Sequence, residues 1–290
     1  MRTALVVLCK NQQNYAGHIA SGILSQTVKP DTVLVVVDRP RPGELEAVRT
    51  AYASVEGCQF LSVDEPPVPI SRPRMLHGIP PFCAGYCRDR ALEYLDGQYD
   101  IAIFTDGDCI PQSQLVDSHL AAYVPGCVTV GRRVEAKWKG RDQRQAYKAR
   151  PIDIFGDTPL DIDNEVYVAD SGVMWTCNAG LTCGAVDSLR ELNRRLYGFS
   201  AVFHPDFCGR WGGEDGFLGM ECLYGGIPMR SCPVMEHDGV EHIDHPRPAG
   251  YYDHFEFLPF LDSKRRELMC LLGRTERFRT LLDMVGIRDA

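Results

Sequence analysis

Short runs of apolar, β-branched residues alternate with helical patterns along the first half of the sequence. The runs at 3–8, 32–37, 59–63 and from 101 onward predict buried strands. The segments between them carry apolar residues at helical spacing, as in 44–55. Because strands that alternate with helices form βαβ units, the sequence predicts an α/β fold with a mainly parallel central sheet flanked by helices.

Two acidic residues follow the apolar run that begins at Ile101. In Asp106-Gly107-Asp108, a single glycine separates two carboxylates that repel each other unless a cation lies between them. Ligands of open α/β sheets bind beyond the carboxyl ends of the strands, and hard divalent ions prefer carboxylate oxygens. The motif therefore predicts a metal and nucleotide site, although a solvated Asp-Gly-Asp turn is an alternative.

The composition excludes several classes of protein. The chain has 290 residues, is 44% hydrophobic and carries a formal net charge of −8, which disfavours general binding to nucleic acids or anionic membranes. Its 12 cysteines form no CxxC pair, and we expect most of them to be buried thiols in a reducing compartment. With no apolar stretch of eighteen residues, the sequence predicts a soluble, cytoplasmic protein.

The second half of the chain holds three further features. A basic block at 132–150 precedes an acidic block at 153–170, which predicts a solvated excursion or, alternatively, a lid or docking surface. The acids of Trp211-Gly212-Gly213-Glu214-Asp215 open a helix that runs to about Tyr224, where helix capping is the simplest role for them. The tail from 262 to 284 has an amphipathic helical pattern.

The order of these motifs resembles that of nucleotide-sugar-dependent glycosyltransferases of the GT-A (Rossmann-like) fold, most closely the family 2 group. The resemblance extends over residues 3 to 240. It begins at Leu5–Asn11, which is similar to that family's opening strand, although Cys9-Lys10 replaces the usual residues. It continues through the strand that ends at Asp38. The resemblance implies that Cys9, Asn11 and Asp38 bind the nucleotide sugar, with Asp38 at the base.

The segment from 84 to 108 extends the resemblance. Arg88 matches an arginine in the helix before the metal-site strand, although Asp89 stands where that family usually has asparagine. Asp106-Gly107-Asp108 corresponds to the DxD motif, in which the second acid ligates the metal. The resemblance implies that Arg88, Asp106 and Gly107 contact the nucleotide sugar, that Asp108 binds the metal, and that Asp106 assists through water or the ribose.

The segments from 211 to 237 are similar to those of β-1,4-galactosyltransferases and chondroitin-type polymerases. In their Trp-Gly-Gly-Glu-Asp motif the aspartate is the catalytic base, which implies this role for Asp215. Glu214 would then orient the acceptor, and Trp211 and Gly213 would lie in the acceptor site. Met235-Glu236-His237 resembles the segment with the histidine metal ligand, which implies that His237 joins Asp108 and Asp106 at the metal.

The resemblance implies an inverting, metal-dependent glycosyltransferase of the hexosyltransferase type. It would move a sugar from a nucleoside-diphosphate sugar, with UDP as the expected nucleotide, to an acceptor hydroxyl. Mn²⁺ suits a mixed oxygen and nitrogen ligand set better than Mg²⁺. Inversion is expected because a retaining relative carries asparagine at the position of Asp215. The acceptor stays open among saccharides, lipid-linked molecules, proteins and modified nucleic acids.

The resemblance also implies a domain organisation. Residues 1–245 would form the GT-A domain, with a nucleotide-binding half at 1–130 and an acceptor-binding half at 131–245. Residues 246–290 would form a C-terminal helical extension packed on it.

Three other functions remain open from the sequence. A nucleotidyltransferase of related fold would be expected to show a glycine-rich basic loop after the first strand, where this chain has Cys9–Asn14. A non-catalytic nucleotide-sugar-binding module would not require an acid at position 215. A metal-dependent hydrolase would release free sugar without an acceptor.

Overall fold

The computed structural model describes residues 1–64, 83–135, 176–208, 213–233, 235–243 and 257–273, and its strands form two sheets. The larger sheet has seven strands in the order β3-β2-β1-β4-β8-β6-β9. These strands are β1 (Thr3–Cys9), β2 (Thr32–Asp38), β3 (Cys58–Val63), β4 (Ile101–Asp106), β6 (Val128–Val130), β8 (Ala179–Thr182) and β9 (Met229–Ser231). The smaller sheet has the order β5-β10-β7, from β5 (Cys109–Pro111), β7 (Arg133–Glu135) and β10 (Val240–His242).

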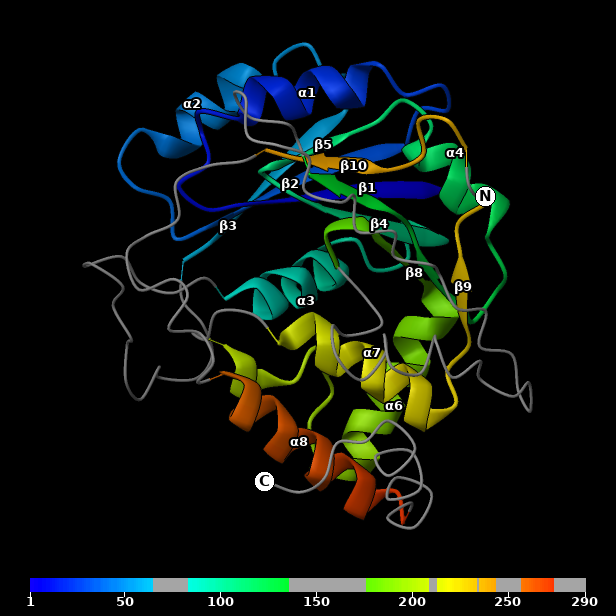
Figure 1. Ribbon diagram of the computed structural model, residues 1–290. Helices are drawn as coiled ribbons and strands as arrows, with labels where there is room; N and C mark the ends of the chain where they lie inside the picture. The colour runs from blue at the N-terminus through cyan, green and yellow to red at the C-terminus, as the bar shows by residue number, and fades with distance from the viewer. Residues whose placement is uncertain (65–82, 136–175, 209–212, 234, 244–256, 274–290) are drawn as a thin grey trace.

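Helices cover both faces of the larger sheet (Figure 1). The described helices are α1 (Ala16–Leu24), α2 (Glu44–Ala51), α3 (Ala84–Tyr94), α4 (Leu115–Ala121), α6 (Cys183–Tyr197), α7 (Glu214–Gly225) and α8 (Phe257–Leu271), with short 3₁₀ turns at η1 (Thr176–Asn178) and η2 (Pro205–Phe207). The sheet and its flanking helices confirm the predicted α/β class.

The alternation of side chains along each strand divides the core into two layers. Leu5 and Val7 of β1 face α1, α2 and α4, whereas Val6 and Leu8 face α3, α6 and α7. All four side chains are fully buried. Each of them contributes about 1.5–3 kcal/mol relative to an exposed position. The apolar runs form strands because both faces of a parallel sheet must be covered.

The direction of the strands brings several loops to one edge of the sheet. Strands β1, β2, β3 and β4 are mutually parallel, with Leu8 opposite Asp106 and Cys9 opposite Val37. The polar residues that follow β1, β2 and β4 therefore lie at the same carboxyl edge.

Strand β8 is antiparallel to both β4 and β6, and the sequence analysis did not predict it. Its residues Ala179 and Gly180 are small, and a side chain at Gly180 would meet Thr129 Oγ1 at 2.3 Å. The next helix, α6, begins at Cys183, and the Thr182 hydroxyl caps it by accepting a hydrogen bond from the backbone N–H of Ala185.

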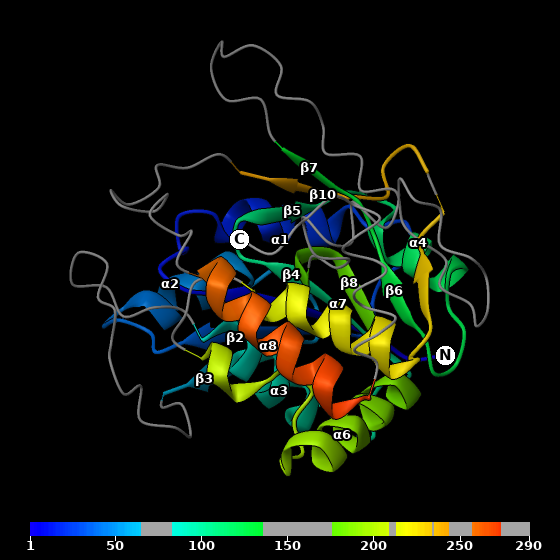
Figure 2. The same ribbon diagram turned by 60° about the horizontal axis from the view of Figure 1, so that its bottom comes forward.

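Helix α8 lies beside α7 (Figure 2). The two helices pack through an apolar cluster that includes Phe207, Phe217 and Leu268. It overlaps the start of the helix predicted at 262–284, and residues beyond 273 lie outside the described part. Both the acidic block at 153–170 and most of the basic block at 132–150 also lie outside it. None of the described helices combines the length and apolarity that crossing a bilayer requires.

The cysteines are free thiols, as expected. Eight of them are buried, Cys58, Cys183 and Cys208 are half-buried, and Cys270 on α8 is exposed.

Candidate functional site

Asp38 ends β2 at the carboxyl edge and is held by two cations. Lys10 Nζ donates a hydrogen bond to its Oδ2 at 2.6 Å, and Arg39 Nε donates to its Oδ1 at 2.7 Å. Its side chain is only 2% exposed. Burial alone would raise the pKa of Asp38, but the hydrogen bonds from Arg39 and Lys10 hold that pKa below its ordinary value. Asp38 is therefore an ionised acceptor.

The loop after β1 is organised by Glu44, a residue that the sequence analysis did not identify. Glu44 Oε1 accepts a hydrogen bond from the backbone N–H of Asn11 at 2.6 Å, and its Oε2 accepts from the N–H of Arg41 at 3.0 Å. Asn11 has a φ of +56°, a left-handed conformation that a non-glycine residue rarely adopts. Such strain persists only where the surroundings enforce it, and it concentrates at functional sites.

Cys9 and Gly107 form the floor of this loop. The N–H of Gly107 donates to the carbonyl of Leu8 at 2.6 Å. A Cβ at Gly107 would lie 2.6 Å from Gln12 Oε1 and 2.9 Å from Cys9 Sγ, so the close approach of β1 and β4 requires glycine here. Burial and the negative charges nearby raise the pKa of the Cys9 thiol, which keeps it neutral.

Arg88 joins three elements that are distant in the sequence. This α3 side chain is only 2% exposed, and its guanidinium donates to Asp106 Oδ1 at 2.9 Å and to Glu214 Oε1 at 3.2 Å. It also lies over the ring of Phe203, 5.7 Å from the ring centre. One arginine thus fixes the end of β4 and the beginning of α7 relative to each other.

Asp108 lies beside His242, and the sequence analysis did not select this histidine. His242 Nε2 lies 3.6 Å from Asp108 Oδ2, and the two side chains are 7% and 14% exposed. The pairing of β10 with β5 produces this contact, because His242 is opposite Cys109 in the antiparallel register. A carboxylate oxygen and an imidazole nitrogen at this separation form a donor pair that fits Mn²⁺.

His237, the histidine selected from the sequence, lies elsewhere on the same segment. Its carbonyl accepts from the backbone N–H of Gln114, and its ring nitrogen lies 3.6 Å from Glu236. The side chain is 56% exposed. The structure therefore brings His242, rather than His237, to the side of Asp108.

Glu214 and Asp215 begin α7, where Gly213 takes a φ of +91° to turn the chain into the helix. Asp215 Oδ1 accepts from the backbone N–H of Gly216 at 2.7 Å. Burial, followed by the charge of Glu214, raises the pKa of Asp215 to about 7. A carboxyl group with this pKa can exchange a proton near neutral pH. Trp211 lies outside the described residues.

Asp106 lies between these groups. Burial, together with the neighbouring Asp108 and Glu214 charges, raises its pKa, while Arg88 opposes the increase. The carboxyl edge thus joins Asp38, the Arg88 ion pairs, Asp108 with His242, and the start of α7. This arrangement can accept a nucleotide at the β1 and β2 side and a divalent ion at the β4 side.

Comparisons with known proteins identify the fold. No protein family model and no curated protein sequence matches the chain. Among solved structures, the chain is similar to the mannosyltransferase PcManGT of Pyrobaculum calidifontis in complex with GDP-Man and Mn²⁺, with a TM-score of 0.54 and 15% identity. That match covers 100% of this chain and 76% of the other.

A second similar structure is TarS of S. aureus in complex with UDP-GlcNAc. The TM-score is 0.56 at 13% identity, and the match covers 99% of this chain and 76% of the TarS 1–349 chain. Both proteins are glycosyltransferases of the GT-A type. The chain therefore has the α/β fold of the GT-A glycosyltransferases.

Proposed function

We propose that this protein is an inverting, metal-dependent glycosyltransferase that moves a sugar from a nucleoside-diphosphate sugar to an acceptor hydroxyl. The observation that carries the proposal is the two ion pairs that Arg88 makes with Asp106 and Glu214. They hold the end of β4 against the start of α7, where Glu214 and Asp215 lie. The proposed metal site and the proposed base are thereby held at one edge of the sheet. PcManGT and TarS, of similar fold, were crystallised with GDP-Man and Mn²⁺ and with UDP-GlcNAc.

The donor would lie along the carboxyl edge. Asp38, held ionised by Lys10 and Arg39, is the proposed acceptor for an N–H of the nucleotide base, with UDP as the expected nucleotide. The loop at Cys9 and Asn11 would contact the nucleoside. Gly107 would let the diphosphate approach the backbone closely.

Asp108 and His242 are the residues that we propose for the metal, with Asp106 as a further oxygen ligand or ribose contact. A divalent ion such as Mn²⁺ held by these residues would neutralise negative charge on the leaving diphosphate. The expectation that His237 is a ligand stays an untested prediction, and the 3.6 Å separation of His242 Nε2 and Asp108 Oδ2 favours His242.

Asp215 is the proposed base. Its ionised carboxylate would accept the proton of the acceptor hydroxyl as the oxygen attacks the anomeric carbon from the face opposite the diphosphate. General-base assistance of this kind contributes about 10²–10⁴-fold to the rate. A single base and one displacement produce inversion. Glu214, fixed by Arg88, would orient the acceptor.

A donor screen by thermal denaturation tests the proposal. Nucleotide sugars are added one at a time with Mn²⁺, and with EDTA as the matched control. At a donor concentration 100 times Kd, binding adds about 2.7 kcal/mol, or roughly 5–10 °C in Tm. A shift from one nucleotide sugar that EDTA abolishes supports the proposal. A Tm shift caused only by nucleoside triphosphates contradicts the proposal. So does the absence of a Tm shift with every nucleotide tested.

A further inference from the structure

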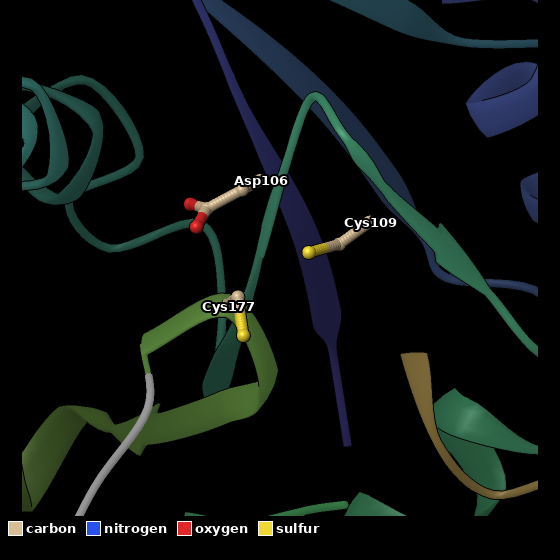
Figure 3. Close-up of side chains that lie close together, drawn as sticks. All are labelled: Asp106, Cys109 and Cys177. Carbon is tan, nitrogen blue, oxygen red and sulfur yellow. The ribbon is translucent and has the colours of Figure 1, made fainter. Parts of the chain in front are cut away.

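Two buried thiols lie behind Asp106, and the proposed reaction uses neither of them. Cys109 begins β5 and Cys177 lies in η1, and one ligand atom from each of Asp106, Cys109 and Cys177 lies within 4.8 Å of the other two (Figure 3). The two cysteines are only 1% and 3% exposed, and their thiols are hydrogen-bonded to each other. The cluster thus joins the end of β4 and the beginning of β5 to η1, which is distant from them in the sequence.

The donor atoms of this cluster differ in kind from those at Asp108 and His242. Two sulfur atoms and one carboxylate oxygen suit a thiophilic ion such as Zn²⁺, which binds cysteine sulfur at about 2.3 Å and carboxylate oxygen at about 2.0–2.2 Å. Mg²⁺ and Mn²⁺ prefer oxygen ligands. We infer that Asp106, Cys109 and Cys177 form a second metal site, which is selective for Zn²⁺ over Mn²⁺ and has a fourth position open to water.

The surrounding structure fixes these ligands in advance. Asn178, next to Cys177, accepts a 2.7 Å hydrogen bond from His119 Nε2 and donates through Nδ2 to the carbonyl of Arg132 at 2.8 Å. Cys109 is held in β5 by its pairing with β10. Because the ligands are already placed, little conformational entropy opposes binding.

Asp106 is the most exposed of the three ligands. Its side chain is 27% exposed, whereas both thiols are buried. The same carboxylate receives the hydrogen bond from Arg88. If the proposed function holds, Zn²⁺ would compete for Asp106 with Arg88 and with the Mn²⁺ or ribose proposed to contact it, and would therefore weaken Mn²⁺-dependent donor binding.

Cadmium titration of the full-length reduced protein, without nucleotide, tests the site. Cd²⁺ substitutes for Zn²⁺, and its bonds to thiolates absorb in the ultraviolet. We expect the Cd–thiolate absorbance of the site to saturate at one ion per chain, to be reversed by Zn²⁺ and to persist in excess Mn²⁺. Absence of this absorbance from the wild-type protein overturns the inference without any variant.

Variants locate the ion. Cys109→Ser and Cys177→Ser should each weaken Cd²⁺ binding by about 10-fold or more, since even residues outside the ligand shell change metal affinity by 10–100-fold. The matched control is Cys83→Ser with Cys208→Ser, a second hydrogen-bonded thiol pair that has the guanidinium of Arg39 within 3.6 Å of Cys83 Sγ. We expect this control to bind Cd²⁺ like the wild type.

Two further readouts keep the test decisive. If circular dichroism shows that a serine variant does not fold, the alanine variant at the same position, Cys109→Ala or Cys177→Ala, is measured in its place. Retention of tight Cd²⁺ binding by the folded variants contradicts the site. Zn²⁺ binding without any Mn²⁺-dependent nucleotide binding would support the site and contradict the proposed function, so the two failures are distinguishable.

Discussion

At the scale of single residues, Asp215 offers the most direct test of the chemistry. Its pKa is raised to about 7 by burial and by the charge of Glu214. A base must be ionised to accept a proton, so we expect the transfer rate to rise with pH and to level off above about pH 7. The measurement is initial rate against pH at a saturating concentration of the donor that the screen identifies.

Asp215→Asn should lower the transfer rate by about 10²–10⁴-fold and leave donor affinity nearly unchanged. The amide keeps the shape of the side chain but cannot accept the proton. Glu46→Gln, an exposed change on α2, is the matched control. An equal loss of donor binding and transfer in Asp215→Asn would contradict the assignment of a base.

The metal ligands are distinguished by comparing two histidines. His242→Ala should weaken Mn²⁺-dependent nucleotide binding by about tenfold or more, because it removes the imidazole beside Asp108. His237→Ala, an exposed position, should change the affinity little. Calorimetric titration of the nucleotide with and without Mn²⁺ measures both effects. The reverse result would favour the ligand set expected from the sequence.

At the scale of elements, Arg88 determines how α3, β4 and α7 meet. Arg88→Met should reduce the free energy of unfolding by about 3 kcal/mol, because it leaves the Asp106 and Glu214 carboxylates without a partner. Urea denaturation measures the change.

A second variant separates charge from packing at this junction. Adding Glu214→Gln to Arg88→Met removes one of the unpaired charges, so the double variant should recover part of the lost stability. No recovery would mean that the loss comes from the packing of Arg88 against Phe203 and not from its ion pairs.

At the scale of the whole molecule, Asp89 ties stability to pH. Its carboxylate accepts from the backbone N–H groups of Val202 and Phe203 at 2.8 and 3.1 Å, yet burial raises its pKa from 3.8 to about 7. Between these two values the unfolded chain has lost a proton that the folded chain keeps. The free energy of unfolding therefore falls as pH rises, by up to about 1.4 kcal/mol per pH unit.

Asp89→Asn removes this titration, so its stability should vary less with pH over the same interval. Urea denaturation at a series of pH values measures the slope. Glu46→Gln, on an exposed part of α2, should retain the wild-type slope. Parallel curves for Asp89→Asn and the wild type would contradict the prediction.

The sequence predicts the α/β class well because its apolar runs are long enough to specify β1, β2 and β4. It does not predict β8, which is only four residues long and begins with the small residues Ala179 and Gly180. Nor does it distinguish His242 from His237, because that choice depends on the register of the three-residue strand β10 against β5. The contact between Arg88 and Glu214 joins positions 126 residues apart, and only the folded chain shows it.

Cys270 is the exposed member of a set of cysteines that are otherwise buried or half-buried. A thiol-reactive fluorophore should therefore modify this position first in the native protein, with no need for a cysteine-free background. Since Cys270 lies on α8, two residues after Leu268 in the α7 contact, the dye would report whether α8 stays in place while an acceptor binds. The natural sequence thus already supplies a labelling site for single-molecule fluorescence.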